Sequence, residues 1–214
     1  MPTPRSGRRR RNNAFRPAVF LNLPYDRRFQ SLFLAYIAGV SAFGMTPHAT
    51  LEIAGSERRL DRIYERLSSC PYSIHDLSRV QLERSRPPTP RFNMPFELGL
   101  AVAHEKAGGK HAWFVFETMD RRIMKSLSDL NGTDVYIHRG KADRLFSQLG
   151  NAFLRTVPAP TVPQMRAIYR ALRASVPGIL RETGCSGLFE ARPFQELSAL
   201  AIGLTDKIVL GNNP

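Results

Sequence analysis

Cysteine and long apolar runs are both scarce in this chain of 214 residues. Its two cysteines, Cys70 and Cys185, lie far apart and lack the spacing of metal ligands, which is typical of reduced thiols in a cytosolic protein. No apolar run approaches the roughly 18–20 residues that span a bilayer, and the arginine-rich N-terminus lacks the apolar segment of a secretory signal. We therefore expect a cytoplasmic protein without membrane association.

Several motifs that bind phosphate groups or catalyse hydrolysis are also missing. The chain has neither G-x-G-x-x-G nor G-x-x-x-x-G-K-[ST] after its first apolar run, which argues against an ordinary dinucleotide or P-loop site. It lacks G-x-S-x-G as well, which argues against an α/β-hydrolase. No two of its five histidines have the i,i+4 spacing suited to zinc, so we predict neither a metal site nor a bound cofactor.

Acidic residues are absent from residues 1–16, where six arginines lie. This segment supplies nearly half of the formal net charge of +13 and is predicted to be a disordered basic tail. Such a tail binds polyanions weakly and without specificity. Specific recognition of a nucleic acid is not favoured, because the tail lacks the interleaved aromatic residues that stack on bases.

Short apolar runs alternate with helical periods along residues 17–157, and this pattern predicts an α/β domain. The alternation and the short connections indicate a flavodoxin-like, doubly wound parallel sheet of five strands in the order 2-1-3-4-5. The expected strands cover residues 18–23, 48–53, 72–77, 111–116 and 133–138. The expected helices cover residues 29–44, 56–67, a segment that ends near residue 106, and 141–155.

Residues 158–214 are predicted to form a small helical extension. Three prolines between residues 158 and 163 mark a break, after which residues 163–182 and 191–203 indicate two helices. Apolar positions recur at helical spacing on the first of them, and such a stripe must cover either the domain's own surface or that of another copy. We favour a homodimer that involves this segment. The stripe consists of Met165, Ile168, Leu172, Val176 and Ile179.

Three polar clusters follow expected strands. The first strand runs into residues 22–26, the third ends in residues 74–78, and residues 93–99 open the next helix with Glu97 in its first turn. Ligands of a sheet wound in this way bind at the carboxyl ends of its strands. The residues expected to line one cleft there are Asn22, Tyr25, Asp26, Asp76, Asn93 and Glu97.

Each of these residues also has a simpler interpretation. Strand ends are loops, and loops are polar, so the clustering alone does not distinguish a functional site from ordinary loop residues. Glu97 would then only complement the helix dipole, a contribution of about 0.3–1 kcal/mol. His75 lies in an apolar strand beside Asp76, and we interpret it as a hydrogen-bonded core histidine rather than a catalytic one.

The three clusters together resemble a known family. The order Phe20-Leu-Asn-Leu-Pro-Tyr-Asp26, Ile74-His-Asp-Leu-Ser78 and Asn93-Met-Pro-Phe-Glu-Leu-Gly-Leu-Ala101 is similar to the nucleoside 2-deoxyribosyltransferase-like group, which is related in fold to Toll/interleukin-1 receptor (TIR) domains. The resemblance covers about residues 18–138. It implies an enzyme that cleaves N-glycosidic bonds, and bacterial proteins of this kind often act in phage defence or as toxins.

The resemblance also implies roles for individual residues. Glu97 matches the catalytic carboxylate that attacks or stabilises the anomeric carbon, and Asp76 matches the acidic residue that orients the sugar or the base. Two departures leave the substrate open: residues 92–95 are Phe-Asn-Met-Pro where the family has small residues, and the loop from Arg79 to Arg91 is long and arginine-rich. The residues expected to bind substrate are Asn22, Tyr25, Asp26, Ser78, Arg91 and Asn93.

The chemistry favours a nucleotide as substrate. Cleavage of an N-glycosidic bond builds oxocarbenium character on the ribose, which a desolvated carboxylate stabilises or traps. The nicotinamide of NAD is already cationic and leaves without protonation, so one glutamate could suffice, with Arg79 and Arg91 as candidates for the pyrophosphate. Two alternatives stay open: a non-catalytic module that senses a nucleotide in the same crevice, and a nucleic-acid-associated protein that depends on the basic tail.

Overall fold

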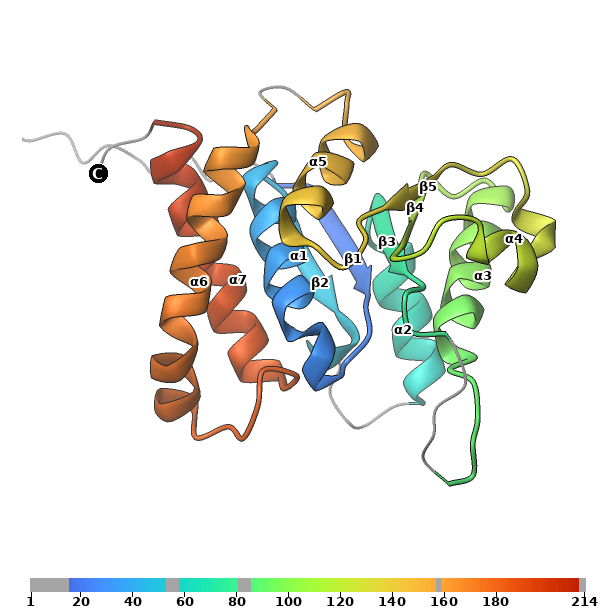
Figure 1. Cartoon of the computed structure of the whole chain (residues 1–214), viewed down its shortest axis with the longest axis horizontal. Helices are drawn as coiled ribbons and strands as arrows, with labels where there is room; N and C mark the ends of the chain where they lie inside the picture. The colour runs from blue at the N-terminus through green and yellow to red at the C-terminus, as the bar shows by residue number, and fades with distance from the viewer. Residues whose placement is uncertain (1–15, 53–57, 81–85, 157–158, 212–214) are drawn as a thin grey trace, which may run out of the picture.

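A computed structural model describes residues 16–52, 58–80, 86–156 and 159–211. It confirms the predicted five-stranded parallel sheet with the strand order β2-β1-β3-β4-β5 (Figure 1). The buried run Val19-Phe20-Leu21 places β1 in the interior of the sheet, paired with a strand on either side. The strands are β1 (Ala18–Asn22), β2 (Thr46–Ala49), β3 (Tyr72–Asp76), β4 (Ala112–Glu117) and β5 (Val135–Ile137).

The second strand lies earlier in the chain than the sequence predicted. It was expected over residues 48–53, but β2 ends at Ala49 and the 3-10 helix η2 (Thr50–Glu52) follows. The Glu52 carboxylate turns back and accepts a hydrogen bond from the Ala49 backbone N–H at 3.1 Å. Pro47 is tolerated within β2 because this strand lies at the edge of the sheet.

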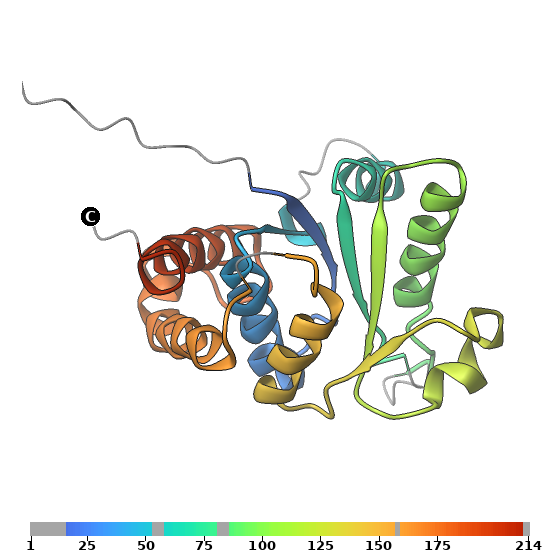
Figure 2. The same ribbon diagram turned by 90° about the horizontal axis from the view of Figure 1, so that it is seen from above.

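Helices cover both faces of the sheet (Figure 2). One face carries α2 (Arg59–Ser68) and α3 (Asn93–Lys106), and the other carries α1 (Gln30–Ala42) and α5 (Ala142–Ala152). The helices α6 (Val162–Thr183) and α7 (Ala191–Ile208) form a further layer outside α1. Because α1 is enclosed between the sheet and this layer, its residues 32–42 are all buried, which explains why its sequence is apolar on every side. The remaining elements are short: η1 (Arg27–Phe29), α4 (Arg122–Ser126) and η3 (Ser128–Leu130).

The apolar stripe of α6 covers the protein's own surface. Met165, Ile168 and Leu172 are buried, and they belong to the same hydrophobic cluster as the strand residues Val19 and Leu21. Val176 and Ile179 pack against that cluster as well. The C-terminal helices therefore share one core with the sheet, and the stripe is not exposed for a partner.

The predicted disordered tail, residues 1–16, lies outside the described residues except for its last member. The Arg16 guanidinium forms an ion pair with Asp206 of α7. Within the described part of the chain, no helix is long and apolar enough to cross a membrane.

Candidate functional site

A cavity of about 290 Å³ opens beyond the carboxyl end of β1, between the segments that follow β2 and β3. The chain leaves β1 toward α1 on one face of the sheet and leaves β3 toward α3 on the other. Open parallel sheets bind their ligands at such a point, where the strand order reverses. Segments from β1, η2, α2 and α3 form its walls. The lining residues are Asn22, Leu23, Pro24, Tyr25, Thr50, Arg59, Arg91, Asn93, Met94 and Glu97.

Glu97 is the carboxylate of this cavity. It was expected in the first turn of its helix, but α3 begins at Asn93 and places Glu97 in the second turn, where the dipole effect has largely fallen off. Its side chain is only 5% exposed, and Oε2 has no hydrogen-bond partner among the described residues. Burial raises the pKa of Glu97 from 4.5 to about 7, although the positive charge of Arg59 opposes this shift. The group is thus able to change its protonation state near neutral pH.

The Asn22 side chain connects neighbouring elements of the cavity. Its Nδ2 lies 3.0 Å from His75 Nδ1 on β3 and 3.0 Å from the Met94 carbonyl oxygen on α3. A carbonyl only accepts hydrogen bonds, so the amide nitrogen must face Met94, and His75 Nδ1 must accept its second hydrogen. This side chain therefore links β1, β3 and α3 around the carboxylate.

The hydrogen bonds continue from His75 along the sheet, away from the cavity. His75 Nε2 donates to Ser73 Oγ at 2.9 Å, which in turn contacts His111 Nε2 at 2.7 Å, and His111 Nδ1 reaches the Cys70 carbonyl at 2.7 Å. Complete burial lowers the pKa of His75 to about 3, with His111 contributing. His75 is therefore a neutral structural histidine that orients Asn22.

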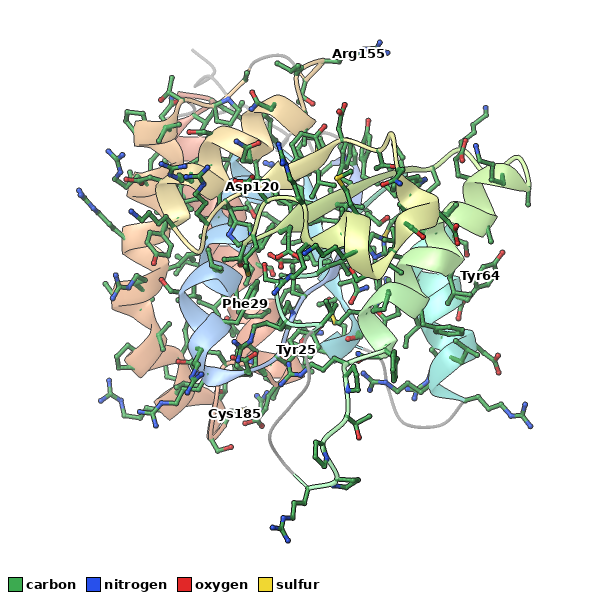
Figure 3. All side chains as sticks on the ribbon, turned by 45° about the vertical axis from the view of Figure 1, so that its right-hand side comes forward. Tyr25, Phe29, Tyr64, Asp120, Arg155 and Cys185 are labelled. Carbon is green, nitrogen blue, oxygen red and sulfur yellow. The ribbon has the colours of Figure 1, made fainter. Side chains whose placement is uncertain are left out.

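Tyr25, which is labelled in Figure 3, also lines the cavity. Its hydroxyl lies 2.9 Å from Thr50 Oγ1, and its ring packs against Phe33 of α1 and Phe189, with centroid distances of 6.2 and 5.7 Å. Burial raises the pKa of the Tyr25 phenol well above its usual value. The phenol therefore remains protonated and is able to donate a hydrogen bond.

Asp26 lies behind the cavity wall rather than in it. Its Oδ1 accepts from the Arg28 backbone N–H at 3.0 Å and so caps η1. Its Oδ2 accepts from Arg79 Nε at 3.0 Å and from Arg91 Nη1 at 3.3 Å. Asp26 thus positions Arg91, which lines the cavity, whereas Arg79 is not among the lining residues.

Asp76 and Ser78, which were also expected at the site, belong to a separate buried cluster and do not line the cavity. The Asp76 carboxylate accepts from the Tyr36 hydroxyl at 2.7 Å, from His138 Nε2 at 3.0 Å and from the Ser78 backbone N–H at 2.9 Å. The Gly140 N–H donates to His138 Nδ1 at 3.0 Å, so the imidazole proton must lie on Nε2. Asp76 therefore ties β3 to α1 and to the segment after β5.

Arg59 and Thr50 are cavity residues that the sequence did not single out. Arg59 is the first residue of α2 and the cation that acts on Glu97. Both follow β2, where no motif marks the chain. Only their position could have indicated these two residues, since residues after β2 also lie at the carboxyl edge of the sheet.

Comparisons with protein-family models, with curated proteins and with solved structures find no significant match to this chain. Among the described residues, no group of three or more histidine, cysteine or acidic side chains comes together in a way that could hold a metal ion. The function is therefore inferred from the residues of the cavity.

Proposed function

We propose that this chain cleaves the N-glycosidic bond of a nucleotide such as NAD, with Glu97 as the carboxylate that acts on the anomeric carbon. The observation that carries the proposal is the buried Glu97 Oε2, which has no partner among the described residues and belongs to a side chain that lines the cavity. A buried polar atom without a partner is costly, so its retention favours a role with a ligand. The resemblance of residues 18–138 to N-glycosidases supports the same chemistry.

The remaining lining residues fit a sugar with a neighbouring phosphate. Arg59 and Arg91 supply positive charge for a phosphate oxygen. Both amide hydrogens of Asn22 are used within the protein, which leaves Oδ1 as the atom that a ribose hydroxyl could reach. The volume of about 290 Å³ lies at the small end of ligand pockets, so it suits the ribose and the base rather than a whole dinucleotide.

The reaction requires the C–N bond to break with its electron pair moving to the base. Nicotinamide starts as a cation and leaves neutral, so no proton is needed. The ionised Glu97 stabilises the cationic ribose carbon or forms a bond to it, and water then supplies the hydroxyl and releases a proton. We place this reaction in the cytoplasm.

Release of free base tests the proposal. The protein would be incubated with NAD, with nucleosides and with nucleoside monophosphates, and the free base measured. Glu97→Gln should lower the rate at least about 10³-fold, whereas Glu105→Gln, a half-buried position further along α3, should leave it unchanged. For the active protein, kcat/KM should rise as pH increases through about 7, because the ionised form of Glu97 is required. Full activity of Glu97→Gln would contradict the assignment.

A non-catalytic nucleotide sensor is the second candidate. One observation favours it: Glu97 is the one carboxylate among the described residues that line the cavity, so a base that needs protonation lacks a second acid. A nucleotide that raises the melting temperature of the wild-type protein without releasing base would support sensing over catalysis.

A further inference from the structure

A concave basic surface lies between α5 and α6, which are neighbours in Figure 1. It encloses about 530 Å³ and lies on the α1 side of the sheet, whereas α3, the helix that carries Glu97, lies on the other side. Five cations and a single carboxylate line it. They are Lys141, Arg144, Arg166, Arg170 and Arg173, with Asp143 as the acid. We call this surface the basic groove.

The arginines of α6 form one row along the groove. Positions 166, 170 and 173 follow the i, i+4, i+7 spacing of a single helix face, and the row spans about 10 Å at 1.5 Å per residue. The Arg173 guanidinium lies 5.7 Å from the centre of the Tyr169 ring. Arg170 and Arg173 are exposed, so a ligand can reach both.

The α5 wall adds charge of the same sign. Lys141 and Arg144 are exposed at the start of α5. Asp143 is already engaged, because its Oδ1 accepts from Arg166 Nε at 2.9 Å. One carboxylate cannot neutralise five cations, and a concave surface lined by one sign of charge attracts ions of the opposite sign.

The groove lacks a surface for stacking bases. Tyr169 is its one aromatic lining residue; it is 8% exposed, and its hydroxyl lies 2.6 Å from Ser31 Oγ. Proteins that bind single strands without specificity combine positive charge with exposed aromatic rings. Because the groove lacks such rings, the phosphate backbone of a duplex is the better match. A row of about 10 Å aligned with the axis of a duplex lies alongside about three phosphates of one strand, because each strand carries one negative charge per 3.4 Å of that axis.

We propose that the basic groove binds the phosphate backbone of a double-stranded nucleic acid without reading its sequence. This site is independent of the cavity at Glu97 and of the proposed glycosidic cleavage. It is also distinct from the N-terminal tail, because all of its cations belong to the packed helices α5 and α6 or to the residue before α5.

The test compares two variants of the full chain that remove equal charge. The groove variant carries Arg144→Gln, Arg170→Gln and Arg173→Gln, and the control carries Lys125→Gln, Arg155→Gln and Arg181→Gln, three exposed positions outside the groove. Binding to a 20-base-pair DNA of mixed sequence would be measured by fluorescence anisotropy between 50 and 200 mM salt. Thermal melting would establish that both variants are folded.

Each phosphate contact contributes about 0.9 to the slope of log affinity against log salt. The groove variant should therefore reduce the slope by about 2–3 and weaken binding at least about tenfold, whereas the control should change the slope by less than 1. Equal losses in both variants would show that only net charge matters and would overturn the proposal. The same holds if the groove variant binds like wild type, or if vesicles of anionic lipid bind as tightly as the duplex and show the same loss.

Discussion

Glu97 and Asp76 are both buried carboxylates, one on α3 and the other at the end of β3, yet their surroundings differ. Asp76 accepts three hydrogen bonds from protein groups, whereas Oε2 of Glu97 accepts none from the described residues. A satisfied carboxylate is suited to holding the fold, and an unsatisfied one in a cavity is suited to a ligand. This difference leads to separate predictions for the two side chains.

Glu97→Gln should change the pH dependence of stability. The pKa of Glu97 is raised from 4.5 to about 7 in the folded protein. As pH rises, the unfolded chain therefore loses this proton at a lower pH than the folded protein does. Folding stability due to the protonated group is therefore complete below pH 4.5 and is lost as pH rises through about 7. The shift corresponds to about 3 kcal/mol. Glutamine cannot ionise. The free energy of unfolding of the variant, measured by urea denaturation relative to the wild type, should therefore increase by up to this amount between pH 5 and pH 8. A stability difference that is the same at both pH values would contradict the prediction.

Asp76→Asn should destabilise the protein by about 3 kcal/mol. The new amide would place a donor against the Tyr36 hydroxyl or His138 Nε2, which are themselves donors to Asp76, and a buried polar group without a partner is costly. Urea denaturation measures the effect. The exposed Asp120→Asn, which breaks only a surface ion pair with Arg139, should change stability by less than about 1 kcal/mol. Unchanged stability together with a loss of base release would show instead that Asp76 acts on the substrate.

At the scale of elements, strands and helices were largely predictable because their periods are strong. The strand order followed from the alternation of the two, and the structure confirms it. Several boundaries differ from the prediction, and two of them have local causes. The Glu52 carboxylate ends β2 through a backbone contact, and α3 begins at Asn93 after Phe92, which makes no side-chain cap hydrogen bond, so neither boundary carries a conventional sequence signal.

The membership of the cavity was harder to predict than the fold. Four of the residues expected together from strand ends line one cavity, as does Arg91, which was expected as a phosphate ligand; the four are Asn22, Tyr25, Asn93 and Glu97. Proximity to a strand end could not separate Asp76 from them, because two of the three groups that hydrogen-bond to this residue are 40 and 62 positions away in the chain. Such long-range contacts leave no local pattern, which is also why Arg59 was missed.

The start of α6 offers a test of one element. Thr161 and Gln164 form a reciprocal capping box, in which Gln164 N donates to Thr161 Oγ1 at 3.3 Å and Thr161 N donates to Gln164 Oε1 at 2.8 Å. Thr161→Ala should lower the free energy of unfolding by about 1 kcal/mol in urea denaturation. Ser147→Ala on the exposed face of α5 is the matched control and should stay within about 0.5 kcal/mol. A loss as small as that of the control would mean that packing alone fixes the start of α6.

At the scale of the whole molecule, the C-terminal helices are part of the core rather than an appended module. The stripe from Met165 to Ile179 packs with α1 and the sheet in one cluster, so it no longer supports the expected homodimer through this segment. A homodimer itself stays a prediction, and light scattering of the full chain would measure it. A dimer would have to use a surface other than this stripe.

Removal of residues 159–214 should abolish cooperative folding. Without α6 and α7, the outer side of α1 would be exposed to water, although residues 32–42 of that helix are buried in the intact protein. Each large apolar side chain exposed in this way loses about 1.5–3 kcal/mol, and a few such losses exceed the usual net stability of about 5–15 kcal/mol. The shortened chain should therefore bind a hydrophobic dye and melt without a sharp transition. A chain lacking residues 1–15 keeps the ion pair of Arg16 with Asp206 and should melt like the full protein. A cooperative transition of similar midpoint in the chain that ends at residue 158 would show that residues 17–157 fold as an independent domain.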